Sequence, residues 1–390
     1  MTLFAPGSAY QVPVYILGLG QVGRQLVQDL LQAAPTHAEQ FNTIFQFRGL
    51  FDSNGAVIDD QFLDEDLVKS ILQWKQEGKA LKDHEKGISC TTDLLIGKIE
   101  KTAIVVDTSA TEKTIPLLLS AIGSGAGVAI ANKKPVTSTS DVFQKLNSPQ
   151  GFIGIESTVG AGTPIIACLD RLLASGDQVI FIEGTLSGTL GFLATEWENG
   201  KPFSIAVEEA YNLGYTEPDP RDDLSGMDVA RKALILARKC GATNLELDDI
   251  LVEPLFHPNL QKLPIPDFLE SLSGLDDSFN QKIAAATDNG CVMRYVARIE
   301  LNYPKSGSKS RPNAKITVGL QEVPISSPLG QLSGTDNLVA FTTSTYDSSP
   351  LVIRGKGAGV KVTASGVIAD MIQISKWRQS NCLYDRLQRS

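Results

Sequence analysis

The segment Val14–Leu31, VYILGLGQVGRQLVQDLL, contains a short apolar run, three spaced glycines and an amphipathic repeat in direct succession. Val14–Leu17 predicts a buried strand, and from Val22 onward apolar residues recur on one face of a helix. Between them lie three glycines in the pattern G-x-G-x-x-G, namely Gly18, Gly20 and Gly23. This strand–turn–helix setting is what gives the motif its meaning. The segment therefore predicts an α/β fold with a doubly wound parallel sheet that binds a dinucleotide.

Each glycine of the motif has its own task in dinucleotide binding. Gly18 permits the tight turn after the strand, Gly20 lets the backbone approach a pyrophosphate, and Gly23 allows the helix to pack closely. The free N–H groups of Gly20, Gln21 and Val22 would hold the pyrophosphate at the helix N-terminus. We therefore expect these five residues to form the cofactor-binding turn.

A second apolar run, Ile44–Phe51, predicts a strand that ends at Asp52. An acid at this place hydrogen-bonds the adenosine ribose of NAD. Its distance from the glycines is longer than usual, and a polar insert around Pro35–Gln40 would account for the difference. Ser53 and Asn54 would suit a 2′-phosphate, so both NAD and NADP stay open. Asp52 also fits an ordinary turn residue at the end of a strand.

Two further strands end in small polar and basic residues. Ala103–Val106 is followed by Asp107-Thr108-Ser109, and Gly127–Ala131 is followed by Asn132-Lys133-Lys134-Pro135. Open α/β sheets bind their ligands at the carboxyl ends of parallel strands. We therefore expect Lys133 to face the substrate, although a solvated surface lysine is the alternative.

Composition and charge exclude several classes of protein. A length of 390 residues with 42% hydrophobic content predicts two or three domains with ample cores. The net charge of −9 disfavours nucleic acid and anionic membranes as partners. No apolar run reaches the roughly 18 residues that span a bilayer, and the N-terminus lacks the basic region of a signal peptide. Five scattered cysteines without a CxxC pair indicate reduced thiols, so we expect a cytoplasmic protein.

The second half of the chain contains an acidic segment, GYTEPDPRDDLSGMDVARK, over Gly214–Lys232. Pro218 and Pro220 are expected to hold its first part extended, because proline biases the preceding residue away from the helical region. A helical pattern follows, which makes Asp228 and Lys232 neighbours one turn apart on the same face. Taken alone, the segment also fits a solvated charged loop with a surface ion pair.

Six motifs follow one another along the chain: GLGQVG, ANKKP, ESTVGAGTP, EGTLSGTL, GYTEPDPRDDLSGMDVARK and GAGVKVTASG. Their combination resembles the homoserine dehydrogenase family over nearly the whole chain. The resemblance implies reversible hydride transfer between L-homoserine and L-aspartate 4-semialdehyde with NAD(P)(H), in threonine, methionine and isoleucine biosynthesis. We find no preceding aspartokinase module and no length for a C-terminal regulatory domain, so the chain resembles the short, monofunctional form.

The resemblance also implies a fold and a domain plan. A Rossmann-type doubly wound parallel sheet, formed by residues 1–149 plus 356–390, would bind the dinucleotide. An α+β domain with a mixed sheet, residues 150–355, would bind the substrate, hold the catalytic residues and form a homodimer.

Roles for individual residues follow from the resemblance together with their chemistry. No histidine is placed to transfer the hydroxyl proton, so Lys232 is the best proton donor and acceptor, with Asp228 orienting it. Glu217 would bind the substrate ammonium group, and Asp223 and Asp228 would hold substrate polar groups or the lysine. Lys133 would assist carbonyl polarisation, and it remains the alternative for proton transfer.

Two further sets of residues are implied by the resemblance. The nicotinamide side of the cofactor site would be lined by Thr108, Gly214 and Gly359. A monovalent cation, expected to be Na⁺, would be held largely by backbone carbonyls at Glu156, Val159, Ala161 and Thr163. An ordinary glycine-rich turn before a helix is the alternative for this second set.

Two other functions are compatible with the same chain plan. A nucleotide-sensing regulatory protein would have the fold without catalysis, but the joint presence of the acidic residues and the two lysines argues against it. An aspartate-semialdehyde dehydrogenase would need an activated cysteine, and no cysteine here lies in a polar loop with an evident histidine partner.

Overall fold

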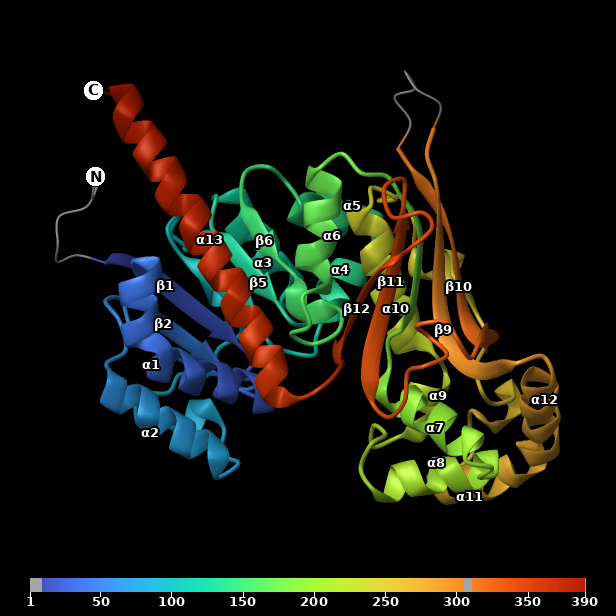
Figure 1. Cartoon of the computed structure of the whole chain (residues 1–390). Coiled ribbons are helices and arrows are strands. Elements are labelled where there is room, and N and C mark those ends of the chain that lie inside the picture. The colour runs from blue at the N-terminus through green and yellow to red at the C-terminus, as the bar shows by residue number, and fades with distance from the viewer. Residues whose placement is uncertain (1–8, 305–310, 390) are drawn as a thin grey trace. The chain divides into compact units, whose positions relative to one another are not determined.

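The computed structural model describes residues 9–304 and 311–389, with the backbone alone for 381–389. The chain divides into two compact units (Figure 1). Unit 1 comprises Met1–Gly162 and Gly359–Ser390, and unit 2 comprises Thr163–Ala358. Each unit contains one six-stranded sheet.

The sheet of unit 1 has the strand order β3-β2-β1-β4-β5-β6. Its strands are β1 (Tyr10–Leu17), β2 (Thr43–Phe51), β3 (Ala56–Ile58), β4 (Ile104–Asp107), β5 (Gly127–Ile130) and β6 (Phe152–Gly154). β3 runs antiparallel to β2, and the other strands pair in parallel. Every residue of β4 and β5 is buried, as expected for central strands covered on both faces. The expected doubly wound parallel sheet is confirmed.

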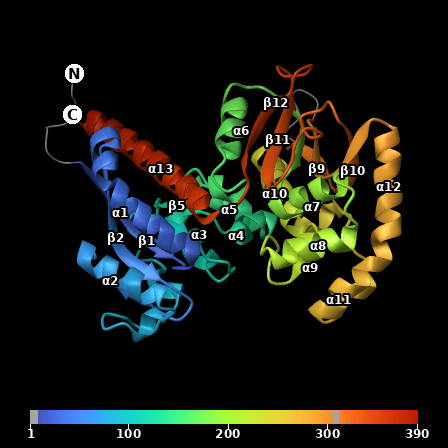
Figure 2. The same ribbon diagram turned by 60° about the horizontal axis from the view of Figure 1, so that its bottom comes forward.

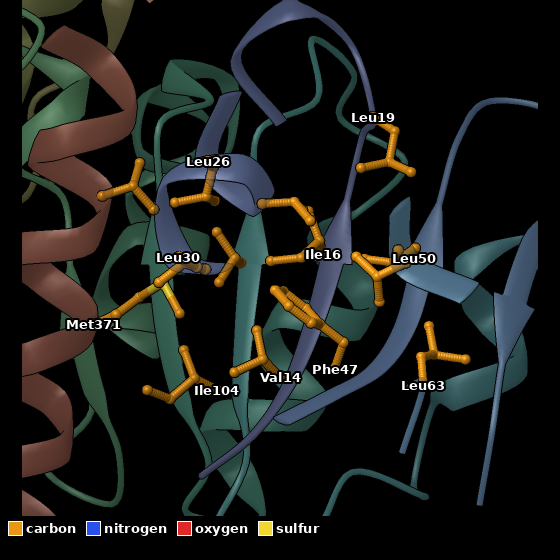
Figure 3. Close-up of a cluster of buried hydrophobic side chains, with 14 of the residues drawn as sticks. Val14, Ile16, Leu19, Leu26, Leu30, Phe47, Leu50, Leu63, Ile104 and Met371 are labelled. Atoms are coloured by element: carbon orange, nitrogen blue, oxygen red, sulfur yellow. The ribbon is translucent and has the colours of Figure 1, made fainter. Parts of the chain in front are cut away.

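Helices on both sides of this sheet complete unit 1. They are α1 (Gln21–Phe41), α2 (Glu65–Gln76), α3 (Ile115–Gly123), α4 (Lys133–Thr137), α5 (Ser140–Leu146) and α13 (Val360–Arg389), with 3₁₀ turns η1 (Leu81–Asp83), η2 (Thr92–Leu95) and η3 (Glu156–Thr158). α13 lies beside α1 in both views (Figures 1 and 2). Its Met371 joins the buried cluster that contains Val14, Leu30 and Ile104 (Figure 3). The end of the chain therefore returns to the first core.

The polar residues Pro35–Gln40, expected to lengthen the spacing before Asp52, belong to α1, which continues through Pro35 to Phe41. A proline inside a helix removes one backbone hydrogen bond and crowds the preceding turn. The helix end is nevertheless packed against the core. His37, two residues after Pro35, is buried, and its ring meets the Phe45 ring edge-on with the centroids 5.7 Å apart. The long spacing before β2 is thus helix rather than loop.

The sheet of unit 2 has the order β12-β11-β7-β9-β10-β8. Its strands are β7 (Val179–Thr185), β8 (Leu251–Val252), β9 (Cys291–Asn302), β10 (Asn313–Pro324), β11 (Asp336–Thr343) and β12 (Leu351–Lys356). Neighbours pair antiparallel except for the short β8, which runs parallel to β10. The expected mixed sheet is confirmed.

The helices of unit 2 are α6 (Ile165–Ala174), α7 (Gly188–Glu198), α8 (Phe203–Asn212), α9 (Pro220–Leu224), α10 (Met227–Lys239), α11 (Ile265–Ser271) and α12 (Asp276–Asp288), with 3₁₀ turns η4 (Leu247–Asp249), η5 (Pro258–Leu260) and η6 (Leu272–Leu275). α7, α8 and α12 share an aromatic core, in which Phe203 stacks on Phe279 at 4.0 Å and Trp197 lies 5.4 Å from Phe279. No described helix in either unit is long and apolar enough to cross a membrane.

The division between the units follows the sheets. It falls after Gly162, later than the expected boundary after residue 149, because β6 pairs with β5 in the first sheet. The return to unit 1 begins at Gly359 rather than at 356, because Lys356 still belongs to β12. The cysteines Cys90, Cys168, Cys240 and Cys291 are free thiols, and the side chain of Cys382 lies outside the described residues.

Candidate functional site

The turn between β1 and α1 requires glycine at two positions and leaves the third open. Gly18 has a φ of 98°, and a Cβ there would lie 2.8 Å from the backbone of Ser109. A Cβ on Gly23 would lie 2.0 Å from the carbonyl oxygen of Gly18. Gly20, by contrast, has no atom within 4 Å of an added Cβ. It is also the N-cap of α1 and supplies no side-chain cap, so the first amides of the helix are available to an anion.

The end of β4 holds this turn in place. Thr108 Oγ1 donates to the carbonyl oxygen of Gly18 at 2.8 Å, and the Thr108 N–H donates to that of Leu17 at 2.9 Å. A Cβ on Gly23 would also meet Thr108 Oγ1 at 2.9 Å. Thr108 therefore lies directly at the glycine turn, within unit 1, as expected of a cofactor-site residue.

A buried carboxyl group, Asp107, joins the ends of β4 and β5. It is 0% exposed, and its oxygens accept hydrogen bonds from Ser109 N at 2.9 Å, Thr114 Oγ1 at 2.7 Å and Asn132 Nδ2 at 3.1 Å. Burial raises the pKa of Asp107, although these hydrogen bonds oppose the rise. Asn132 in turn caps α4, since its Oδ1 accepts from Lys134 N. Lys133, the first residue of α4, is thereby placed at the carboxyl end of β5.

Asp52, at the end of β2, is engaged on every side by its own unit. Its Oδ1 accepts from the N–H groups of Asn54 at 2.8 Å and Gly55 at 3.0 Å. Its Oδ2 accepts from Lys75 Nζ at 2.6 Å and Leu81 N at 2.9 Å. Burial alone would raise the pKa of Asp52, but the hydrogen bonds from Lys75 and the backbone hold it below its usual range. All four lone-pair sites of a carboxylate are thus occupied.

The glycine-rich turn after β6 is compact and buried. Gly160 and Ala161 both adopt left-handed backbone conformations, with φ of 75° and 58°, and Val159 and Ala161 are buried. Glu156 is 6% exposed, and its N–H donates to Asp370 Oδ2 of α13 at 2.9 Å. These residues belong to unit 1, whereas Thr163 is the first residue of unit 2. Within the described residues, no group of three or more His, Cys, Asp or Glu side chains could hold a metal ion.

In unit 2, Lys232 lies on the buried face of α10 and is 7% exposed. Its Nζ pairs with Asp228 Oδ2 at 2.8 Å and also donates to the carbonyl oxygen of Leu186. Leu186 follows Thr185, whose buried hydroxyl has no hydrogen-bond partner among the described residues. Neither Thr185 nor Leu186 stood out in the sequence, and the one available signal was the run of small residues after a strand.

The middle of the acidic segment, Pro220–Leu224, forms the short helix α9, whereas residues 214–219 before it are not helical, so the expected extended conformation is only partly right. Asp219 has the extended backbone that the following proline favours, and it caps the helix. Pro220 is the first residue of α9, a position that suits its fixed φ. Arg221 clamps the Asp219 carboxylate through Nε and Nη2, and its Nη1 donates to the carbonyl oxygens of Gln261 and Leu263. Asp219 and Arg221 are therefore structural.

The remaining acids lie together. Glu217 is exposed, and its N–H donates to Asp223 Oδ2 at 2.8 Å. The Thr189 hydroxyl of α7 donates its one hydrogen to the carbonyl oxygen of Tyr215 at 2.7 Å, and this side chain lies close to the Asp223 carboxylate. Burial, followed by the negative charges of Glu217 and Asp228, raises the pKa of Asp223 against these hydrogen bonds. The structure thus brings Glu217, Asp223 and Asp228 into one electrostatic cluster.

The expected site residues fall into two groups, one in each unit. Unit 1 contains Gly18, Gly20, Gln21, Val22, Gly23, Asp52, Thr108, Lys133, Glu156, Val159, Ala161 and Gly359, and unit 2 contains Thr163, Gly214, Glu217, Asp223, Asp228 and Lys232. Gly214, which has a φ of 71° after α8, therefore does not share a unit with Thr108 and Gly359.

Comparison with known proteins relates the chain to one family. A family model described as homoserine dehydrogenase matches residues 164–372. The homoserine dehydrogenase of Schizosaccharomyces pombe is 33% identical over 384 residues, which cover 94% of this chain and 96% of that protein. The chloroplastic bifunctional aspartokinase/homoserine dehydrogenase 1 of Zea mays is 35% identical over 369 residues. These cover 93% of this chain but 38% of the relative, so the chain spans well under half of such bifunctional proteins.

Among solved structures, a hyperthermophilic archaeal homoserine dehydrogenase mutant in complex with NADPH matches with a TM-score of 0.69. Its sequence is 25% identical, and the match covers 94% of this chain and 98% of that chain. The similarity therefore extends through both units rather than through the dinucleotide-binding sheet alone.

Proposed function

Because this chain belongs to the homoserine dehydrogenase family, we propose that it catalyses the reversible, NAD(P)(H)-dependent oxidation of L-homoserine to L-aspartate 4-semialdehyde. The observation that carries the proposal is the ion pair between the buried Lys232 and the half-exposed Asp228, beside the acids Glu217 and Asp223. A buried lysine with a carboxylate partner is suited to reversible proton transfer, and the neighbouring acids are suited to an amino-acid ammonium group. A regulatory protein without catalysis would not need this arrangement.

Oxidation of a primary alcohol requires the loss of a hydride and of the hydroxyl proton. NAD(P)⁺, when bound, supplies the hydride acceptor. Neutral Lys232 would take the hydroxyl proton, and protonated Lys232 would return it to the developing alkoxide in the reverse direction. Asp228 stabilises the ammonium form of the lysine, while the Leu186 carbonyl oxygen restrains its Nζ.

Substrate orientation is assigned to the other charged residues. Glu217 would pair with the ammonium group of homoserine. Asp223 would hold Glu217 in place by accepting a hydrogen bond from the Glu217 backbone N–H. Lys133, at the carboxyl end of β5, would polarise the aldehyde carbonyl. We assign the proton to Lys232 rather than to Lys133 because Asp228 stabilises its charged form.

NADP(H) is the cofactor that we favour. The archaeal structure of the same family contains NADPH. The Asp52 carboxylate, which would otherwise favour NAD through the ribose hydroxyls, is already saturated by four hydrogen bonds within unit 1. Ser53 and Asn54 in the same turn are exposed. Asp52 would then shape the turn without choosing between NAD and NADP.

A monovalent cation, Na⁺, is assigned to the turn of Glu156, Val159, Ala161 and Thr163. A hard cation prefers oxygen ligands, and this turn combines backbone carbonyls with the carboxylate of the buried Glu156. We expect replacement of Na⁺ by tetramethylammonium at equal ionic strength to lower kcat/KM, and unchanged activity would remove the cation from the proposal.

The decisive experiment follows absorbance at the reduced-nicotinamide band with homoserine and each cofactor in turn. Turnover with NADP⁺ exceeding that with NAD⁺ supports the proposal, and no turnover with either rejects it. Cofactor binding without turnover would instead favour a nucleotide sensor. A homodimer is also part of the proposal, and light scattering of the purified chain tests it.

A further inference from the structure

Thr189 links α7 to two separate points of the acidic segment. It is the second residue of α7 and is 8% exposed. The cap of this helix is made by Ser187, whose Oγ accepts from Leu190 N, so the Thr189 hydroxyl is not needed for capping. It donates instead to the Tyr215 carbonyl oxygen at 2.7 Å and lies within hydrogen-bond range of the Asp223 carboxylate.

These bonds close a small network around Glu217. Asp223 Oδ2 accepts the Glu217 N–H at 2.8 Å, and the Thr189 hydroxyl holds the Tyr215 carbonyl oxygen two residues earlier. Tyr215 is also held by α7 through its ring, which meets the Phe192 ring edge-on at 5.0 Å. The residues on both sides of Thr216 are therefore fixed by contacts that lead back to α7.

The network matters because the turn that carries Glu217 has few other restraints. Gly214, Tyr215 and Glu217 are all exposed, and Gly214 has open space around its Cα. The N–H of Tyr215 donates to the Ala210 carbonyl oxygen at 2.9 Å, which fixes only the start of the turn. The direction of the Glu217 backbone thus depends on Asp223, which accepts its N–H, and on Thr216, whose Oγ1 donates to its carbonyl oxygen at 2.9 Å. It also depends on the preceding Tyr215, whose carbonyl oxygen accepts from Thr189 of α7.

We propose that Thr189 is a positioning residue for the substrate ammonium group, acting through the Tyr215 carbonyl group on the turn that carries Glu217. The hydroxyl fixes the turn before substrate arrives, so that Glu217 does not lose conformational freedom on binding. The inference rests on the proposed function, in which Glu217 binds the ammonium group of homoserine. It adds α7, a helix outside the acidic segment, to the elements that determine substrate affinity.

The test compares the Michaelis constants of four proteins: wild type, Thr189→Val, Thr189→Ser and Thr195→Val. Thr189→Val keeps the shape of the side chain but removes the hydroxyl. We expect it to raise KM for homoserine about fivefold, as loss of one hydrogen bond to a neutral carbonyl group does. The kcat and the KM for cofactor should stay within about twofold, since no proton- or hydride-transferring group is changed. Thr189→Ser should restore KM, because it restores the hydroxyl.

Thr195→Val is the matched control on the same helix. Thr195 Oγ1 donates to the Gly191 carbonyl oxygen and accepts from Gly334 N, away from the acidic segment. Thr195→Val removes a threonine hydroxyl and its hydrogen bonds from the same helix. The KM of this variant for homoserine should remain at the wild-type value. Thr189→Ala provides a second variant without the hydroxyl if Thr189→Val does not fold.

A double-mutant cycle tests whether the effect of Thr189 on substrate binding passes through Glu217. If Thr189 acts through Glu217, Thr189→Val should have little further effect on KM in a Glu217→Gln background. An unchanged KM for homoserine in both Thr189→Val and Thr189→Ala would overturn the inference, and so would an equal rise of KM in Thr195→Val. Neither outcome affects the proposed function, as long as the wild-type protein turns over homoserine. Absence of wild-type turnover would reject the proposed function itself.

Discussion

Lys75 Nζ donates to Asp52 Oδ2 at 2.6 Å, and both side chains are largely buried, with 13% and 7% exposure. The acid at the end of β2 therefore has a cationic partner from α2 in the same unit. Breaking a buried ion pair on one side leaves the other charge without compensation. The pair thus stabilises the fold around the turn after β2, whichever cofactor is bound.

Substitution of Asp52 should lower stability without changing cofactor choice. We expect Asp52→Ala to reduce the free energy of unfolding by about 2 kcal/mol, measured by denaturant titration, since the pair is buried but not fully enclosed. The ratio of kcat/KM for NADP⁺ to that for NAD⁺ should stay within about twofold. Asp141→Ala, which breaks the exposed Asp141–Lys145 pair, is the control and should change stability by less than about 0.5 kcal/mol. A selective loss of NAD⁺ use would show that Asp52 reads the ribose.

The glycine turn offers a matched pair of substitutions. Gly23→Ala should destabilise unit 1, because its Cβ would lie 2.0 Å from the Gly18 carbonyl oxygen. Gly20→Ala should leave the unfolding free energy within about 1 kcal/mol of wild type, since its φ is −71° and the space around it is open. Gly20→Ala should nevertheless weaken cofactor binding by at least about tenfold in a fluorescence titration. Equal cofactor affinity in Gly20→Ala and wild type would mean that the pyrophosphate does not approach this turn.

The buried Asp107 predicts a pH dependence of stability. Its folded-state pKa is raised above the unfolded value by burial. Its contribution to stability is therefore fully present below the unfolded pKa, about 3.9, and is lost as pH rises through the folded value. Relative to wild type, Asp107→Asn should become progressively more stable as pH increases from about 4 to neutrality, measured by denaturant unfolding at each pH. A difference that is constant or moves in favour of wild type with rising pH would contradict this assignment.

Proton transfer by Lys232 predicts a selective loss of turnover. Lys232→Ala should lower kcat by about 10³-fold, within the range for a missing general acid–base group, while the NADPH dissociation constant changes by less than about threefold. Lys239→Ala, on the same helix and paired with Asp170, is the control and should keep normal kcat. If Lys232→Ala retains near wild-type kcat and Lys133→Ala does not, Lys133 transfers the proton.

Much of the architecture can be read from short stretches of sequence. The β1–turn–α1 segment is local, since the spacing of apolar residues selects strand and helix and the three glycines select the turn. The spacing of Asp228 and Lys232 is also local, because residues four apart on a helix are always neighbours. This spacing allows the ion pair that the structure shows at 2.8 Å.

Errors arose where packing outweighed local preference. The polar residues around Pro35 suggest an insert before β2, yet they form the end of α1, which packs on β2 and α13. The residue before Pro220 is extended as expected, yet Pro220 itself begins α9, because Asp219 and Arg221 complete the cap and anchor it. In both places the proline restricts its own φ and the backbone conformation of the preceding residue. Contacts with other elements determine whether the neighbouring residues form a helix.

The sequence by itself determined the sheet type, the glycine turn and the identity of the charged residues, because these depend on side-chain chemistry and on spacing within single elements. Only the tertiary structure decided which partners those residues have. Asp52 is saturated by Lys75, Leu81 and the following backbone, Lys232 is restrained by Leu186, and the Tyr215 carbonyl oxygen accepts from Thr189. These partners lie on other elements, and their approach depends on how the elements pack rather than on any local preference.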